Sequence, residues 1–319
     1  MHIVILGAGA LGSIISGHLA RAGEDVTVIA RGQRAAYVQH HGITLTGLED
    51  FTVPVAVTTQ PHTVREADVL IVTVKTYDTE AALESVRHLQ VGSVLSIQNG
   101  VLKDEQLARI FGEDKTLGTA VVLSGEVTPA GPVRFTLNEY FAVGELPAGI
   151  SERVQTLVST LARAGIRAEA SPHIRSVEWS KYAFFLSWMA PALLTRQETY
   201  KFISHPESAM VVAQLIQETG LLAARLNIAL EDRGPFPIKT LCSVSLAEAV
   251  TIVRRVGETM ATQAPTHKIS TLQDLERGRR LEFAETLGYA ARKGAELGVP
   301  LPTITTCYRL IAPVHHALQ

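Results

Sequence analysis

The chain begins with a glycine pattern that restricts how its first residues can fold. The apolar run His2–Leu6 leads directly into Gly7, Gly9 and Gly12, which are spaced G-x-G-x-x-G. The run is short and lacks alternation, which is typical of a buried parallel strand, and residues 10–22 carry apolar side chains at helical spacing. At such a strand-to-helix turn the first glycine permits the tight turn and the second admits a ligand to the backbone. The third lets the helix pack on the strand.

A helix that begins at this turn presents free backbone N–H groups and the positive end of its dipole to a pyrophosphate. The pattern therefore predicts a dinucleotide site built from the backbone of Gly7, Gly9, Ala10, Leu11 and Gly12. The alternative is a tight turn that binds nothing, and the flanking strand and helix favour the dinucleotide.

The second strand indicates which dinucleotide is bound. Residues 25–30 (DVTVIA) form this strand, and a site for NAD usually ends it with an acid that accepts the ribose hydroxyls. Here the strand ends without a carboxylate and continues into Arg31 and Arg34. A guanidinium can bind a 2′-phosphate that a carboxylate would repel, so we expect NADP(H) with Arg31 at the phosphate. The alternative is that both arginines are solvated loop residues. The sequence favours the phosphate role for Arg31 and leaves both interpretations open for Arg34.

The order of strand and helix patterns predicts two domains. The chain has 319 residues, of which 46% are hydrophobic, enough for two sizeable cores. Residues 1–170 alternate strands and helices, which predicts an α/β fold of Rossmann type with a doubly wound, largely parallel sheet. Residues 171–319 predict an all-helical domain for substrate and catalysis, with the substrate in a cleft between the domains. The predicted long helices cover residues 172–189, 206–226, 246–262 and 271–297.

Charge, cysteine content and hydropathy exclude several classes of partner. The net charge of −2 implies no nucleic-acid partner. No apolar run reaches the length of a membrane span and no signal peptide is visible, so we expect no membrane partner and a cytoplasmic location. Cys242 and Cys307 lie far apart and fit no metal spacing, which predicts buried thiols and no metal. The late helix over 281–297 could bury its apolar face within the domain or against a second copy in a homodimer.

Polar side chains follow two predicted strands of the first domain. Lys75 follows the strand over residues 68–74, and Asn99 follows the strand over 93–97. Doubly wound folds bind ligands at the carboxyl ends of their strands, so both side chains are candidates for contact with cofactor or substrate. The alternatives are a lysine that reaches into water and a simple Asn-Gly turn at residues 99–100.

The second domain carries two further candidate sites. Lys181 stands in a nearly apolar helical run, where burial would lower the pKa of a lysine and make it a proton donor; the alternative is a lysine that reaches the helix surface. On a continuous helix, Asp274, Gly278 and Glu282 share one face at i, i+4 and i+8. That face is either approached closely by a ligand or another helix at Gly278, or it is a solvated charged face.

Read in order, several segments resemble the ketopantoate reductase (2-dehydropantoate 2-reductase) family. They are GAGALGS, VIARGQR, VTVKTYDT, IQNGV, the mid-chain WSK, LQDLERGRRLEF and GAELGVPLPT. Members of that family have an N-terminal Rossmann domain and a helical C-terminal domain, and they reduce a 2-oxo acid with NADPH on the pathway to pantothenate and coenzyme A. The resemblance covers essentially the whole chain and implies an NADPH-dependent reductase.

The resemblance also assigns roles to individual residues. It implies that Lys181 protonates the developing alkoxide and that Glu282 binds substrate and supports this lysine. The other implied roles are Arg31 at the 2′-phosphate, Lys75 and Asn99 at the nicotinamide and substrate end of the cleft, Ser270 at the substrate and Asp274 as a structural or substrate-side acid.

Four positions depart from the family pattern: Phe185, Met189, and Leu281 and Ala284 beside Glu282. The family carries asparagines one and two helical turns after its lysine, where this chain has Phe185 and Met189, which we expect to line the substrate pocket. An aromatic ring and a thioether cannot replace amide hydrogen bonds, so one alternative substrate is a bulkier, more apolar 2-oxo acid or ketone. An alternative of another class is a non-catalytic NADP(H)-binding sensor, against which the presence of both Lys181 and Glu282 argues.

Overall fold

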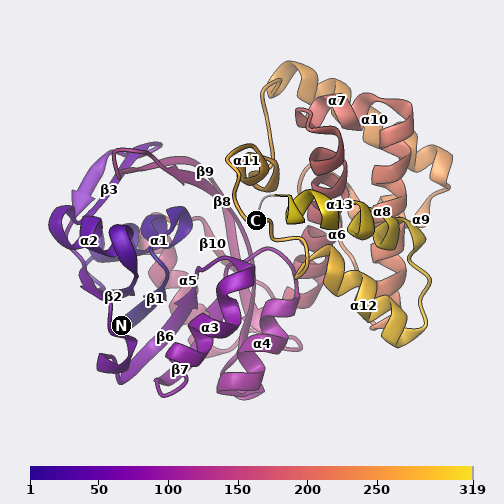
Figure 1. The fold of residues 1–319 in the computed structure, drawn as a ribbon. Helices are drawn as coiled ribbons and strands as arrows, with labels where there is room; N and C mark the ends of the chain where they lie inside the picture. Colours follow the sequence, from indigo (N-terminus) through magenta and orange to yellow (C-terminus); the bar gives the residue numbers. More distant parts are fainter. Residues whose placement is uncertain (318–319) are drawn as a thin grey trace. The chain divides into compact units, whose positions relative to one another are not determined.

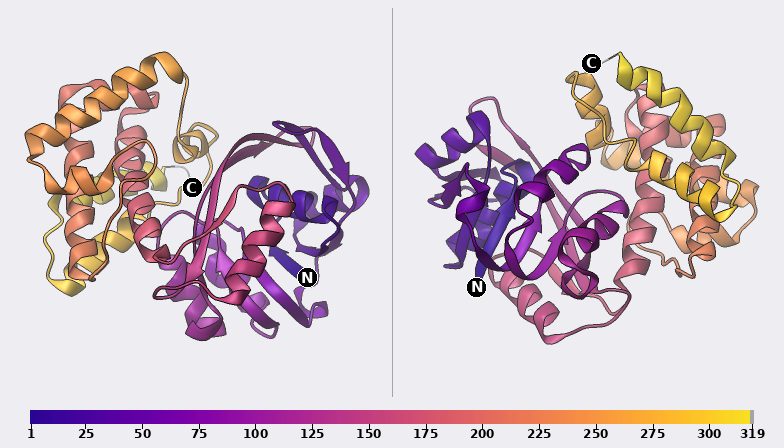
Figure 2. Two further views of the ribbon diagram at one scale, coloured as in Figure 1. Left: turned by 180° about the vertical axis from the view of Figure 1, so that it is seen from behind. Right: turned by 60° about the horizontal axis from the view of Figure 1, so that its bottom comes forward.

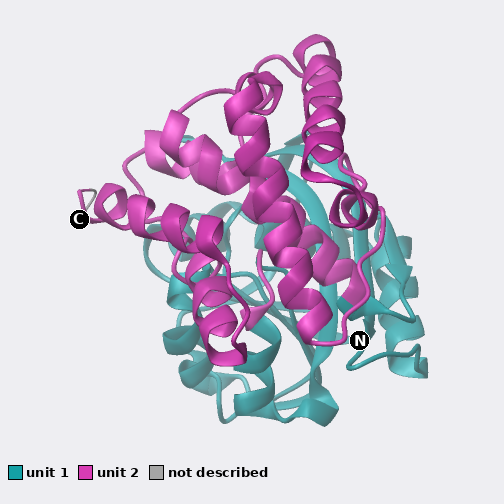
Figure 3. Cartoon of the chain, turned by 90° about the vertical axis from the view of Figure 1, so that its right-hand side faces the viewer, with its two compact units in different colours: residues 1–98, 103–175 teal, residues 99–102, 176–319 magenta. Residues whose placement is uncertain are grey.

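The chain folds into two compact units, drawn in Figure 1 and coloured separately in Figure 3. The computed structural model describes residues 1–317. The first unit comprises residues 1–98 and 103–175, and the second comprises residues 99–102 and the chain from Ser176 onward. The sequence placed the boundary between residues 170 and 171, slightly before this division, and it did not predict that residues 99–102 belong with the second unit.

The first unit is built on a parallel sheet with strand order β5-β2-β1-β6-β7 (Figure 1). Its strands are β1 (His2–Leu6), β2 (Asp25–Ile29), β5 (Ala56–Thr58), β6 (Glu66–Val72) and β7 (Gln90–Ser96). Because β2 pairs with one side of β1 and β6 with the other, the strand order reverses beside β1. In doubly wound folds, ligands bind outside the carboxyl ends of the strands at such a reversal.

Strand β1 faces two different apolar cores. Ile3 and Ile5 share one core with residues of helix α1, whereas Val4 and Leu6 share the other with residues of β6 and β7. Burial on both faces explains why the strand is a continuous apolar run without alternation. The helices of this unit are α1 (Ala10–Arg21), α2 (Gly32–His41), α3 (Thr79–Ser85), α4 (Leu102–Phe111) and α5 (Glu152–Arg163), with a short 3₁₀ turn, η2 (Thr76–Asp78), before α3.

A second, mixed sheet stands where the sequence predicted a continuation of the parallel one. Its strands are β3 (Ile43–Gly47), β4 (Phe51–Val53), β8 (Leu117–Val127), β9 (Val133–Glu145) and β10 (Ala168–Ala170). The order is β10-β9-β3-β4, and β8 pairs antiparallel with β9. The left view of Figure 2 shows the ribbon of this unit from behind. The turn over 128–132 is too short for the crossover that a parallel pair requires, so β8 and β9 form a hairpin.

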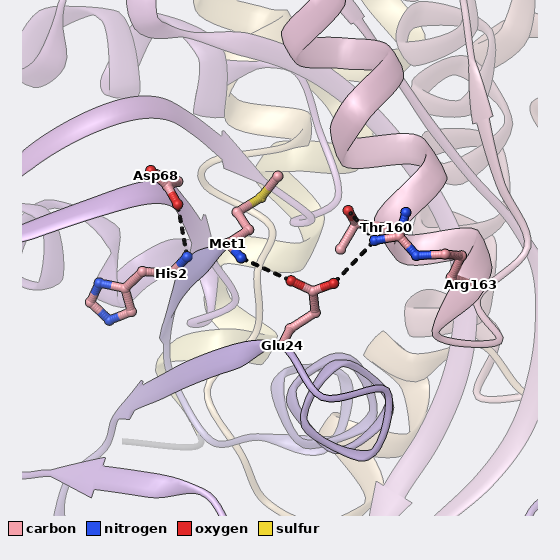
Figure 4. Close-up of polar contacts among 6 residues, drawn as sticks. All are labelled: Met1, His2, Glu24, Asp68, Thr160 and Arg163. Atoms are coloured by element: carbon pink, nitrogen blue, oxygen red, sulfur yellow. Dashed lines mark hydrogen bonds and ion pairs between the residues drawn. The ribbon is translucent and has the colours of Figure 1, made fainter.

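The amino-terminal edge of the parallel sheet is occupied by polar contacts within the protein (Figure 4). The Glu24 carboxylate accepts hydrogen bonds from the amino group of Met1 at 3.1 Å and from Arg163 of α5 at 3.2 Å. The backbone N–H of His2 donates to Asp68 of β6 at 2.8 Å. These groups join β1 to its neighbours at the edge opposite to the carboxyl ends of the strands.

The second unit is helical over the described residues. Its helices are α6 (Ile174–Thr195), α7 (Thr199–Ser204), α8 (Pro206–Arg225), α9 (Ile238–Ser243), α10 (Leu246–Gln263), α11 (Ser270–Glu276), α12 (Leu287–Leu297) and α13 (Pro302–His316). The helices predicted over residues 206–226 and 246–262 are confirmed to within one residue at each end, and the one predicted over 172–189 is confirmed but continues to Thr195. Helix α12 contributes Leu287, Tyr289 and Ala290 to the core of its own unit, so its apolar face is buried within the domain.

The predicted continuous helix over residues 271–297 is wrong. Helix α11 ends at Glu276, and Gly278 adopts a left-handed conformation with φ of 65°. The N–H of Gly278 donates to Leu275 O at 3.0 Å and that of Arg279 to Asp274 O at 2.8 Å, which is a Schellman motif. Asp274, Gly278 and Glu282 therefore do not share a helix face, because the glycine ends the helix and does not mark a close approach on it.

Candidate active site

The glycine-rich turn between β1 and α1 leaves no room for side chains at two of its positions. Gly7 has φ of 115°, and its N–H donates to Ile29 O of the neighbouring strand at 2.9 Å. The Thr73 hydroxyl donates to Gly7 O at 2.8 Å, and a Cβ on Gly12 would lie only 2.1 Å from the same oxygen. At Gly9, by contrast, a Cβ would meet no heavy atom within 4 Å. The turn is therefore tightly packed on one side and open at Gly9.

The start of helix α1 fits the diphosphate of a dinucleotide. The helix begins at Ala10, its N-cap Gly9 supplies no side-chain hydrogen bond, and its first turn holds no acidic residue. Ala10 and Leu11 are partly exposed, while Gly12 is buried against the turn. Backbone N–H groups at a helix start that no side-chain oxygen caps are suited to an anion, and the dipole adds to the attraction.

Arg34, one of the two arginines that follow β2, is bound within the protein. Its guanidinium donates to Ala8 O at 2.8 Å, to the Ser13 hydroxyl at 2.8 Å and to Gly131 O in the β8–β9 turn. Burial lowers the pKa of this guanidinium. Arg34 is thus neither a solvated loop residue nor a free phosphate ligand, and it holds the glycine-rich turn against α1 and the hairpin.

Arg31, the other arginine, is 83% exposed and meets a carboxylate that the sequence did not place there. Its Nη2 lies 2.7 Å from Oδ2 of Asp78, the last residue of η2. No acid follows β2 in the sequence, but the loop after β6 places the carboxylate of Asp78 next to Arg31. Asp78 belongs to the same VTVKTYDT segment as Lys75, so the sequence marked this segment as part of the site. It did not show that Asp78 lies next to Arg31.

Gln98 connects the two strand ends that carry Lys75 and Asn99. Strand β6 ends at Val72, two residues before its predicted end, so the half-buried Lys75 lies in the loop that follows it. The Gln98 side-chain amide donates to Val74 O and to the Thr79 hydroxyl, each at 2.7 Å. This amide is used inside the protein and holds the Lys75 loop beside the end of β7, where the partly exposed Asn99 follows.

In the second unit, the structure brings the segment of Glu282 to the helix that carries Lys181. Lys181 is half-buried in α6, and the next residue, Tyr182, donates its hydroxyl to Thr286 O at 2.8 Å. The Thr286 hydroxyl in turn donates to Glu282 O at 2.5 Å. Glu282 is 7% exposed and belongs to the segment of the chain that connects α11 to α12. Thr286 therefore joins the backbone of Glu282 to α6 at Tyr182, the residue that follows Lys181 in the chain.

Thr286 also lies next to Met189 and near the segment that carries Asn99. Its hydroxyl lies 3.6 Å from the sulfur of Met189 on α6, and a Cβ on Gly100 would lie 3.4 Å from its methyl group. The Asn99–Gly100 segment therefore packs close to Thr286. Met189 is completely buried and Phe185 is 9% exposed, and both belong to the core of the second unit.

Ser270 and Asp274 lie on α11, one helical turn apart. Ser270 is exposed at the first position of the helix, and Asp274 is buried with its carboxylate 3.7 Å from the guanidinium of Arg279. Residues four apart on a helix share a face, so the two side chains are neighbours.

The described residues offer no metal site and no membrane span. Within residues 1–317 no group of three or more His, Cys, Asp or Glu is arranged to hold a metal ion. Cys242 and Cys307 are free, and burial raises the pKa of each thiol to about 11. None of the helices described here combines the length and the apolar composition needed to cross a bilayer.

Comparison with known proteins gives matches along almost the whole chain. The family model "Ketopantoate reductase PanE/ApbA" matches residues 3–148, and "Ketopantoate reductase PanE/ApbA C terminal" matches residues 173–315. The 2-dehydropantoate 2-reductase of Archaeoglobus fulgidus is 29% identical over 316 residues, which cover 99% of this chain and 98% of that protein.

Solved structures have the same fold. A PanE/ApbA family ketopantoate reductase from Ralstonia eutropha JMP134 superimposes with a TM-score of 0.83 at 26% identity and covers 100% of both chains. D-mandelate dehydrogenase with NADH and anilino(oxo)acetate gives a TM-score of 0.85 at 19% identity, with 100% of this chain and 99% of that chain covered. At 19% identity the second likeness concerns the fold alone.

Proposed function

Because the chain belongs to the ketopantoate reductase family, whose members are oxidoreductases that act on a keto group, we propose that it reduces 2-dehydropantoate with NADPH. Lys181 supplies the proton. One observation supports these roles above the others: Thr286 joins the segment of Glu282 to Tyr182, so this segment is attached to the helix that carries Lys181.

The first unit binds the cofactor, which supplies the hydride when bound. The backbone at Gly9, Ala10 and Leu11 holds the diphosphate at the start of α1, where no side chain of the protein caps the helix. Arg31 binds the 2′-phosphate, which gives the preference for NADPH. Lys75 and Asn99, at the carboxyl ends of neighbouring strands, contact the nicotinamide end and the substrate.

The second unit handles the proton and the substrate. As negative charge develops on the carbonyl oxygen, the ammonium group of Lys181 donates a proton to it, a step that a positioned acid accelerates by about 10²–10⁴-fold. The carboxylate of Glu282 orients this ammonium group, and Ser270 and Asp274 on α11 contact the polar groups of the substrate.

The other candidate functions are not favoured. The curated relatives from Archaeoglobus fulgidus and Pyrococcus abyssi are both named 2-dehydropantoate 2-reductase, which supports neither a bulkier substrate nor a sensor without turnover. Met189 is fully buried against Thr286, so it is not free to form an apolar pocket wall. The enzyme works in the cytoplasm, where its two cysteines would stay free. All residues proposed for the reaction come from one chain. Sedimentation velocity tests whether the protein forms a homodimer.

Steady-state oxidation of NADPH with a panel of 2-oxo acids tests the proposed reaction. We expect the highest kcat/KM with 2-dehydropantoate, compared with 2-oxo acids that carry branched or aromatic chains. Lys181→Ala should lower kcat by about 10²–10⁴-fold and leave NADPH binding unchanged, whereas the control Lys201→Ala, at an exposed lysine of α7, should behave like the native protein. A preference for an aromatic 2-oxo acid would refute the substrate, and absence of turnover with every acid would refute the reductase.

A further inference from the structure

Two charged groups lie at the end of β2, the guanidinium of Arg31 and the carboxylate of Asp78. Arg31 is the residue before α2, and Asp78 is the residue before α3, 47 positions later in the chain. Their side chains meet at 2.7 Å, and both residues belong to the first unit. The side chain of Asp78 is 34% exposed, so its carboxylate remains in contact with solvent while it pairs with Arg31.

A carboxylate at this point has opposite effects on the two nicotinamide cofactors. A 2′-phosphate that binds Arg31 must share the guanidinium with Asp78 and is repelled by the carboxylate. A 2′-hydroxyl is a hydrogen-bond donor, and an acid at the end of the second strand is its usual acceptor in sites for NAD. The same pair of side chains therefore offers a partner to each cofactor.

We propose that Asp78 is a second determinant of cofactor choice, which lowers the affinity for NADPH and raises the affinity for NADH, in opposition to Arg31. This inference rests on the proposed use of Arg31 at the 2′-phosphate. Asp78 then influences how strongly the protein distinguishes NADPH from NADH. It lies outside β2 and the loop after it, which are the segments that usually carry the residues for this distinction.

A neighbouring acid provides a matched control. Glu80 lies two residues after Asp78 at the start of α3, but its carboxylate pairs with Arg109 of α4 at 3.0 Å. The exchange Asp78→Asn keeps the size of the side chain, and asparagine is as good as aspartate at the position before a helix. The variant should therefore fold like the native protein and differ from it in charge.

The experiment measures dissociation constants for NADPH and NADH by isothermal titration calorimetry of the purified full chain without substrate. Asp78→Asn should bind NADPH about 3- to 10-fold more tightly, the effect expected of an exposed charge acting on a phosphate that carries up to two charges. It should bind NADH more weakly, and the gain for NADPH should shrink as salt is added. Glu80→Gln should change neither constant.

Arg31→Ala, measured in parallel, tests the cofactor assignment separately from the role of Asp78. If Arg31→Ala selectively weakens NADPH but Asp78→Asn leaves both constants unchanged, the role of Asp78 is refuted and the cofactor assignment stands. If Asp78→Asn weakens both cofactors, the carboxylate serves to hold Arg31 in place, and the inference is also refuted. If Arg31→Ala affects both cofactors equally, the cofactor assignment fails, and the inference fails with it.

Discussion

Replacement of Thr286 by valine removes the hydroxyl that donates to the backbone of Glu282 and keeps nearly the same shape. Thr286 is completely buried, and its hydroxyl donates to Glu282 O while lying 3.6 Å from the Met189 sulfur. In the valine variant the carbonyl of Thr286 still accepts the hydrogen bond of Tyr182, so the segment stays attached to α6 at one point. The variant therefore tests the hydroxyl and its contact with the backbone of Glu282.

The expected loss follows from the burial of this hydrogen bond. A buried carbonyl that loses its donor lowers the free energy of unfolding by about 1–3 kcal/mol. In a protein of about 150–250 residues, each kcal/mol lowers the melting temperature by about 2–4 °C. The melting temperature of the second unit should accordingly fall by about 2–12 °C. Because misplacement of a catalytic group by about 1 Å can cost on the order of 10²-fold, kcat should fall by roughly 10- to 100-fold.

The assay combines thermal unfolding, steady-state kinetics at a temperature where the variant is folded, and the dissociation constant of NADPH. We expect kcat to fall and KM for 2-dehydropantoate to rise, while NADPH binding is unchanged because its proposed ligands lie mainly in the first unit. Thr286→Ser keeps the hydroxyl and should restore most of kcat. A folded Thr286→Val enzyme with native kcat, or a serine variant as slow as the valine variant, would refute the positioning role.

Two further predictions concern stability. Glu218 is buried on α8 and accepts the N–H groups of Thr303 at 2.8 Å and Ile304 at 2.9 Å at the start of α13, so Glu218→Ala should lower the free energy of unfolding by about 2–4 kcal/mol in urea titrations. Glu218→Gln keeps one acceptor oxygen and should lose less; equal losses would contradict the capping role. Burial lowers the pKa of His18 below its ordinary value of 6.5, so the unfolded chain takes up a proton that the folded chain resists. Stability in urea should therefore fall as the pH decreases below about 6.5, and a His18→Gln variant with the same pH dependence would show that other groups are responsible.

The sequence by itself determined the elements whose signals are local. The apolar run, the three glycines and the helical spacing after them specify β1, the turn and α1, because each signal spans only a few neighbouring residues. The long helices of the second unit were predicted for the same reason. The failure at residues 271–297 was also local: the helical pattern runs through Gly278, and only its left-handed conformation shows that this glycine ends a helix.

The tertiary structure alone decided which distant groups meet. It placed Asp78 against Arg31, used Arg34 to hold the glycine-rich turn, and joined Glu282 to α6 through Thr286. Partners in these contacts lie from a few to more than a hundred positions apart, as for Tyr182 and Thr286. A single sequence shows the chemical type of each side chain and its local conformation. The choice of partner depends on how strands and helices pack, because packing decides which loop ends share an edge of the sheet and which polar groups become buried together.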